Sequence, residues 1–81
     1  MRSGTNVRKI KVDVAATGCR IKELMEIKGL STRELSGIMK VSFQAVYRWQ
    51  HGESLPSLDN LFILGRILET AVDDMLVVIE E

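Results

Sequence analysis

The chain reads STRELSGIMKVSFQAVYRWQHG over residues 31–52, and this stretch decides the fold. The serine-x-x-glutamate pattern of residues 31–34 is a capping box, which opens a helix. Lys40-Val41 interrupts that helix, and Ser42 can cap another helix that ends at Gly52. Two short helices joined by about three residues are typical of a helix-turn-helix motif.

Apolar residues at helical spacing predict further helices on both sides of this stretch. A first helix is expected from about Ala16 to Lys28, with Gly29 as its stop, and Ser57 can cap a fourth helix. The pair Asp73-Asp74 suits the start of a short fifth helix, because acidic side chains stabilise a helix N-terminus. The sequence therefore predicts an all-α bundle of about five short helices. The residues expected to face inward are Ile21, Leu24, Met25, Leu35, Ile38, Met39, Trp49, Leu58, Leu61, Leu64, Ile67, Leu68 and Met75.

Two stretches near the ends of the chain have the character of strands. Residues 10–14 alternate between apolar and charged side chains, which indicates a short strand. A lone strand needs a partner, and the other β-rich stretch is residues 76–79. We therefore expect the two terminal segments to pair, with two frayed tails as the alternative.

Composition excludes several classes of function. The 81 residues are 46% hydrophobic and 27% charged, which fits one small globular domain. With one cysteine, Cys19, and one histidine, His51, the chain has no credible metal site and no nucleophile–base pair. No apolar run approaches the length of a membrane span, and the N-terminus does not resemble a signal peptide. We expect a cytoplasmic protein that is not an enzyme and carries no cofactor or metal.

Charge is distributed unevenly although the net charge is zero. Residues 1–50 hold ten basic and four acidic residues, a formal charge of +6, whereas residues 51–81 hold one basic and seven acidic residues, a charge of −6. A chain of this kind can present its basic half to a polyanion. Solvated helix faces that happen to segregate by charge are the alternative.

The helix expected from Ser42 to about His51 has an unusual outward face. Its inward arc holds Ala45, Val46 and Trp49. Opposite that arc lie Gln44, Tyr47 and His51, flanked by Phe43 and Arg48, and this face includes no acid. Glutamine and arginine can form bidentate hydrogen bonds with adenine and guanine, and aromatic rings can pack on thymine methyl groups. Tyrosine, phenylalanine and arginine also anchor protein interfaces, so a protein-binding face stays open as well.

Four segments together resemble the Xre/Cro-repressor-like helix-turn-helix family. They are GLSTREL at residues 29–35, VSFQAVYRWQHG at 41–52, SLPSLDNL at 54–61 and VDDML at 72–76. The resemblance covers about residues 18–77 and depends on the ordered set at the right spacing. It implies a five-helix, lambda-repressor-like bundle that places its third helix in the major groove of double-stranded DNA.

The resemblance also implies which residues touch DNA. Base contacts fall on Phe43, Gln44, Tyr47 and Arg48. Phosphate contacts fall on Ser31, Thr32, Ser42, His51 and Ser54, to which the charges of Arg33 and Lys40 are added. The chain departs from the family at Lys40 and Glu69, where glycine is usual, and at Glu53, where a basic residue is frequent. A lysine in the left-handed conformation costs of order 1 kcal/mol.

These observations predict a sequence-specific transcriptional regulator that binds double-stranded DNA as a homodimer and acts as a repressor. The domain division expected is an N-terminal extension over residues 1–14, which can include the short strand, and a helix-turn-helix DNA-binding domain over residues 15–81. The alternative is a protein-binding module of the antitoxin or antirepressor type, with its protein partner on the acidic C-terminal half. The exposed apolar residues offered for dimerisation are Phe62, Val72, Val77, Val78 and Ile79.

Overall fold

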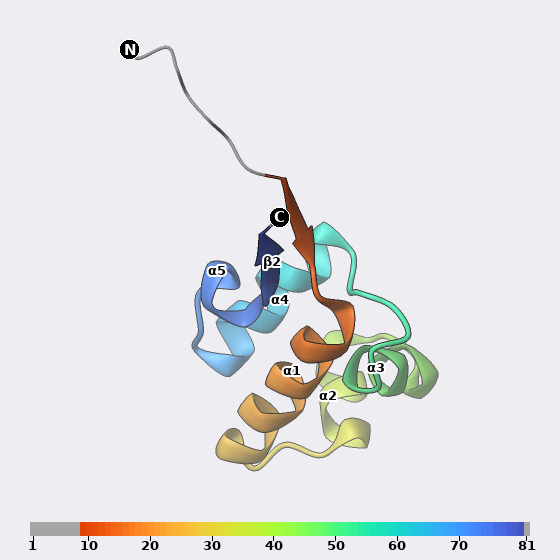
Figure 1. Cartoon of the computed structure of the whole chain (residues 1–81). Helices are drawn as coiled ribbons and strands as arrows, with labels where there is room; N and C mark the ends of the chain where they lie inside the picture. Colours follow the sequence, from red (N-terminus) through yellow and green to blue (C-terminus); the bar gives the residue numbers. More distant parts are fainter. Residues whose placement is uncertain (1–8, 81) are drawn as a thin grey trace.

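The structure is a computed structural model that describes residues 9–80, and it contains five helices and a two-stranded ribbon (Figure 1). This confirms the all-α architecture with its short β pairing. The part of the predicted extension that covers residues 1–8 lies outside the described residues, as does residue 81. In chain order the elements are β1 (Ile10–Val12), α1 (Val14–Lys28), α2 (Thr32–Met39), α3 (Phe43–Gln50), α4 (Leu58–Leu68), α5 (Val72–Met75) and β2 (Val78–Glu80).

The first helix begins two residues earlier than the periodicity predicts. Asp13 caps it, since its Oδ1 accepts a hydrogen bond of 2.9 Å from the backbone N–H of Ala16. The apolar pattern gave no sign of this cap, because Asp13 also fits the alternation of the preceding strand. The helix ends where expected, at Gly29, whose φ of 70° is the left-handed conformation of a helix C-cap.

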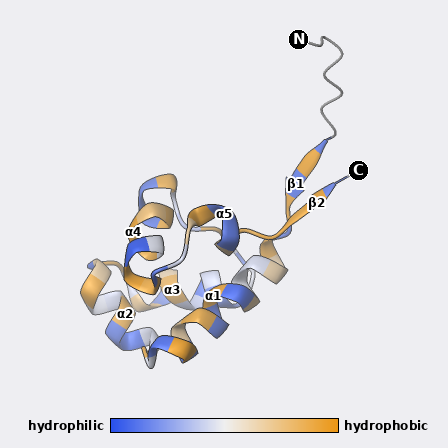
Figure 2. Cartoon of the chain, turned by 90° about the vertical axis from the view of Figure 1, so that its left-hand side faces the viewer, coloured by the Kyte–Doolittle hydropathy of each residue, from blue (hydrophilic) through white to orange (hydrophobic). Residues whose placement is uncertain are grey.

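The strands β1 and β2 are antiparallel, and they project from the helical body in both views (Figures 1 and 2). Lys11 pairs with Ile79 at the middle of the ribbon. The ribbon is joined to the helices through Thr17, which is fully buried in α1. Its hydroxyl accepts a hydrogen bond of 2.9 Å from the backbone N–H of Val77 and donates one of 3.5 Å to the carbonyl of the same residue. The predicted pairing of the terminal segments is therefore confirmed.

The core lies between α1 and the other four helices. Its buried members are Ile21, Met25, Leu35, Met39, Val46, Trp49, Leu64, Leu68 and Met75. All nine were expected to face inward, and Trp49 is a core residue at 5% exposure. Because every helix contributes at least one side chain to this core, its packing fixes the positions of α2 and α3 relative to the other helices.

Two residues predicted to face inward do not. Ile38 is 54% exposed. The side of α2 that packs against its neighbours carries Thr32, Leu35 and Met39. At about 100° per residue, Ile38 lies to one side of Leu35, whereas Thr32 and Met39 lie to the other. Leu58 is 69% exposed although the helical wheel places it on the buried stripe. It is the first residue of α4, and burial of the stripe begins one turn later, at Leu61.

Candidate nucleic-acid interface

The helix-turn-helix consists of α2, a three-residue turn and α3. The capping box predicted at its start is present: Ser31 Oγ accepts a bond of 3.0 Å from the N–H of Glu34, and Glu34 Oε1 accepts one of 2.9 Å from the N–H of Ser31. The turn begins at Lys40, whose φ of 58° and ψ of 43° are left-handed. Lysine therefore occupies the conformation that favours glycine, as the departure from the family pattern predicted, and its exposed side chain leaves the turn toward solvent.

The outward face of α3 is as the helical wheel predicts. Ser42 caps the helix by accepting a bond of 3.0 Å from the N–H of Ala45. The inward side chains are buried at Val46 and Trp49 and half-buried at Ala45. All four residues predicted to contact bases are exposed, and they are Phe43, Gln44, Tyr47 and Arg48. The eight-residue helix α3 therefore has a capped N-terminus and an exposed face without acidic side chains.

The position of α3 depends on a glycine that the sequence analysis did not single out. Gly18 in α1 is buried, and a Cβ added there would lie 2.4 Å from the carbonyl oxygen of Trp49 and 3.0 Å from that of Gln50. The two helices therefore approach with backbone against backbone at the C-terminal end of α3. Gly52 completes this contact, since its own Cβ would lie 2.7 Å from the Cα of Ala15. A glycine within a helical pattern was the available signal for this close approach.

A polar contact ties the start of α2 to the end of α3. Thr32 Oγ1 donates a hydrogen bond of 2.9 Å to Gln50 Oε1, and Gln50 Nε2 lies 3.3 Å from the sulfur of Met25 as its donor. The hydroxyl of Thr32, predicted to contact phosphate, thus has a partner within the protein. Gln50 therefore acts as a bridge between the two helices of the motif, a role that the sequence analysis missed.

Three rings follow one another along the exposed side of α3. The ring centroids of Phe43 and Tyr47 lie 6.4 Å apart at an interplanar angle of 28°, and those of Tyr47 and His51 lie 4.0 Å apart at 32°. The guanidinium carbon of Arg33, on α2, lies over the Phe43 ring at 5.7 Å from its centroid. Such cation–π contacts contribute about 0.5–1 kcal/mol at exposed sites. We call Phe43, Tyr47 and His51 the aromatic ladder.

The remaining residues predicted to contact phosphate surround α3. Arg33 and Lys40 are exposed on the α2 side, and His51 is exposed at the C-cap of α3. Ser54 lies in the loop beyond and is half-buried. Glu53 in the same loop is exposed, and it places one negative charge next to the basic and polar groups of this face. Among the predicted residues, Arg33 on α2 contacts Phe43 on α3, and the contacts of the whole set with DNA stay predictions.

An ion pair outside this face joins α1 to the turn between α4 and α5. Lys28 at the last turn of α1 forms a salt bridge with Glu69, the residue with a left-handed φ of 55° that ends α4. The hydrogen bond and the positive charge of Lys28 lower the pKa of the Glu69 carboxyl below its ordinary value of 4.5. Both departures from the family's glycines, Lys40 and Glu69, therefore carry positive φ, and Glu69 also makes a contact that glycine could not make.

The comparisons with known proteins agree with this geometry. A family model described as helix-turn-helix matches residues 21–75, which is more than half of the chain. The chain belongs to the Xre-like helix-turn-helix family. Among solved structures, the restriction-modification controller protein C.AhdI from Aeromonas hydrophila is similar, with a TM-score of 0.71 and 27% sequence identity. The alignment covers 78% of this chain and 96% of that chain. Among curated protein sequences, the comparison found no match.

The family and the fold make this chain a DNA-binding transcriptional regulator and not an enzyme. Over residues 9–80, no helix is long and apolar enough to cross a membrane. Within the same residues, no group of three or more His, Cys, Asp or Glu side chains is placed to hold a metal ion.

Proposed function

We propose that this protein is a sequence-specific transcriptional repressor that binds double-stranded DNA as a homodimer, with α3 in the major groove. The observation that carries the proposal is the acid-free outward face of α3, where Gln44 and Arg48 are exposed beside a capped helix N-terminus. An amide and a guanidinium can each form two hydrogen bonds with one base in the major groove. The proposal retains the expected cytoplasmic location, since the DNA target would be reached there.

Contacts with the DNA backbone would orient this face. The N-termini of α2 and α3 are capped by Ser31 and Ser42, and each hydroxyl keeps its own hydrogen to donate to a phosphate oxygen. The exposed charges of Arg33 and Lys40 lie on the α2 side of the motif. Contacts of this kind raise affinity for all sequences alike, and they make binding depend on salt.

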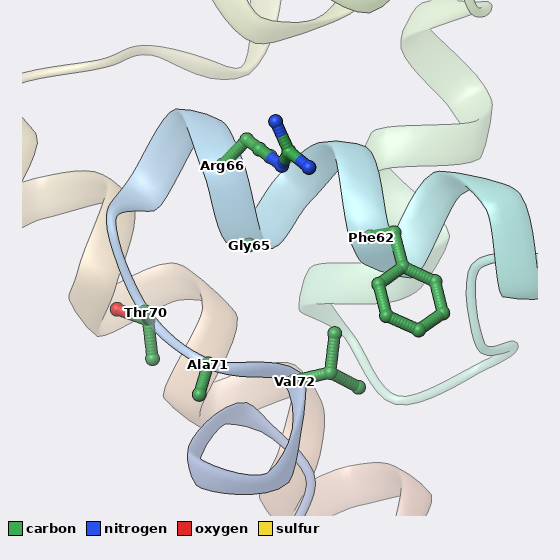
Figure 3. Close-up of a pocket in the computed structure, with 6 residues that line it drawn as sticks. All are labelled: Phe62, Gly65, Arg66, Thr70, Ala71 and Val72. Atoms are coloured by element: carbon green, nitrogen blue, oxygen red, sulfur yellow. The ribbon is translucent and has the colours of Figure 1, made fainter.

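The dimer surface that we propose is on α4 and the segment that follows it. Phe62 is 59% exposed, and its ring faces the Val72 side chain across a shallow pocket of about 320 Å³ (Figure 3). The pocket is lined by Phe62, Gly65, Arg66, Thr70, Ala71 and Val72. A two-fold axis through this surface would bring one Phe62 against the same pocket of the second copy, which is how an isologous interface forms. One recognition helix reads few base pairs, so two half-sites about one helical turn apart would supply the specificity.

The test of DNA reading is selection of bound duplexes from a random library, with the wild type and Gln44→Ala in parallel. The wild type should enrich a palindromic motif. Gln44→Ala should lose one base preference and about 1–3 kcal/mol of binding free energy. Asn60→Ala, which removes a carboxamide from α4 instead, should leave the preference unchanged. A Gln44→Ala variant that binds the selected duplex as tightly as the wild type would show that Gln44 does not read a base.

The test of the dimer is sedimentation of Phe62→Glu beside Ile27→Glu. Ile27 is 78% exposed on α1, so it is a matched control for placing a carboxylate on exposed apolar surface. Phe62→Glu should sediment as a monomer and lose affinity for the palindrome, whereas Ile27→Glu should remain dimeric. Dimeric Phe62→Glu would move the interface elsewhere. Repression itself is tested by a reporter behind the selected duplex, which the wild type should silence and Gln44→Ala should not.

One observation supports the second hypothesis, a module that binds a protein through its C-terminal half. Val78 and Ile79 on β2 are each 46% exposed, and much of the ribbon is hydrophobic (Figure 2). The acidic residues of this half would favour a basic partner. Absence of any enriched duplex from a folded protein, together with capture of one basic partner that Ile79→Lys no longer binds, would favour this function over DNA binding.

A further inference from the structure

The aromatic ladder is an apolar feature on a face that is otherwise polar. Phe43 is 43% exposed and Tyr47 is 45% exposed, so both rings present surface to solvent. The inward side of α3 is already occupied by Val46 and Trp49, which belong to the core. The ladder is therefore not required to complete the core. Burial of its exposed ring surface by a ligand would contribute favourable binding free energy.

The ladder is also ordered from both ends. Arg33 lies over the Phe43 ring at one end, and the His51 ring lies tilted against Tyr47 at the other, with centroids 4.0 Å apart. Neighbours on either side restrict the rotamers of Phe43 and Tyr47 before any ligand arrives. A side chain that is held in place loses less conformational entropy on binding. Arg33 is thus a positioning residue for Phe43 in addition to a source of positive charge.

We propose that Phe43 and Tyr47 recognise the C5 methyl groups of pyrimidines in the major groove, so that the protein senses thymine or 5-methylcytosine at two positions. This inference depends on the proposed function, because it requires α3 to lie in the groove. The methyl group of thymine is the apolar group by which a base is distinguished in the major groove, and the other distinguishing groups there donate or accept hydrogen bonds. The exposed rings match the methyl group, while Gln44 and Arg48 match the hydrogen-bonding groups.

The helix geometry sets the spacing of the two positions. Four residues of helix rise about 6 Å, and successive bases along a strand are about 3.4 Å apart. Phe43 and Tyr47 should therefore address methyl groups about two base pairs apart. Burial of one methyl-sized group corresponds to about 0.8 kcal/mol, which is roughly a fourfold change in affinity.

The experiment uses the duplex recovered by selection, with each thymine replaced in turn by uracil, which removes only the methyl group. Wild-type affinity should fall roughly fourfold at two positions about two base pairs apart. Phe43→Ala should bind the thymine and uracil duplexes equally at one of these positions and keep the preference at the other. Tyr47→Phe keeps the ring and should retain the wild-type pattern. Gln44→Ala is the matched control, and it should retain both methyl preferences.

A second measurement restores the methyl group without restoring thymine. At each sensitive position the T·A pair is replaced by C·G, with the cytosine either unmodified or 5-methylated. The methylated duplex should bind roughly fourfold more tightly than the unmodified one, and Phe43→Ala should abolish this difference at its own position. Circular dichroism confirms that each variant is folded, which the exposure of Phe43 leads us to expect.

The outcomes separate this inference from the proposed function. Tight binding of the selected duplex with no loss for any uracil substitution overturns methyl recognition and leaves DNA reading intact. If Phe43→Ala lowers the affinity for the thymine and uracil duplexes by the same factor, the ring acts only on the shape of α3, and methyl recognition is again overturned. A preference for single-stranded thymine over the duplex would indicate base stacking instead. Recovery of no duplex by a folded protein overturns both proposals.

Discussion

Replacing Gly18 with alanine should loosen the contact that sets the position of α3. The added Cβ would lie 2.4 Å from the Trp49 carbonyl oxygen and 3.0 Å from two further backbone atoms, in Gln50 and Gly52. Real Cβ atoms essentially never approach closer than 3.0 Å, and backbone atoms cannot rotate away as the end of a side chain can. The substitution therefore forces α1 and α3 apart.

The magnitude follows from two opposing effects. Overpacking of a well-packed site costs about 1–3 kcal/mol, and a clash with backbone belongs at or above the upper end of that range. Alanine is the better helix former by about 1 kcal/mol, which offsets part of the cost. The net loss should be about 2 kcal/mol. At roughly 4–8 °C per kcal/mol for a domain of this size, Tm should fall by about 8–16 °C.

The chain offers a matched control in Gly37→Ala. Gly37 lies within α2, and a Cβ added there would meet nothing within 4 Å. The same chemical change should therefore raise stability by about 0.5–1 kcal/mol, through helix propensity alone. Thermal melts followed by circular dichroism at 222 nm give the sign of both changes. A Gly18→Ala variant at least as stable as the wild type would refute the account of how α1 positions α3.

Three further predictions concern other features of the structure. Lys40→Gly should raise the free energy of unfolding by up to about 1 kcal/mol, because it relieves the left-handed conformation of the lysine. It should also reduce by about one unit the slope of log affinity for the selected duplex against log salt concentration. An unchanged slope would mean that Lys40 does not neutralise a phosphate. Because Lys28 lowers the pKa of Glu69 in the folded protein below 4.5, the contribution of this ion pair is fully present above the unfolded pKa and is lost as pH falls through the folded value. Lys28→Met should therefore lose less stability than the wild type in urea melts taken at successive pH values below about 4.5, and parallel curves would contradict the assigned cause. Thr32→Val should lower the free energy of unfolding by about 0.5–1.5 kcal/mol, because it removes the bond to Gln50 Oε1; in a double-mutant cycle with Gln50→Ala the two losses should not add, and additive losses would show that the bond contributes nothing.

The sequence was sufficient for those features that depend on local chemistry. A serine with a glutamate three residues later predicted the capping box, and the helical period of α3 predicted which side chains face outward. The left-handed conformation at Lys40 was predictable from the family resemblance, because glycine is usual at that position. The pairing of the terminal segments was also predictable, since each strand had one candidate partner.

What the sequence could not predict depends on contacts between distant segments. The hydrophobic period of α1 does not show that Gly18 contacts the end of α3, because the need for a small residue in a helix depends on which segment packs against it. Ile38 and Leu58 were misplaced for a related reason: a wheel gives the direction of a side chain and not whether another element covers it. The contact between Arg33 and Phe43 crosses from one helix to the next and follows from their docking angle.

The bond between Thr17 and Val77 has a consequence for the order in which the chain folds. It joins residues 60 positions apart, whereas α2 and α3 are joined by a turn of three residues. Closing so long a loop costs more chain entropy than closing a short one, and the contacts that reward it become available only after the helices between them have packed. The β1–β2 ribbon should therefore form late in folding and open early in unfolding. Amide hydrogens of Val12 and Val78 would then exchange through local opening, while those of Ile21 and Val46 would await unfolding of the whole domain.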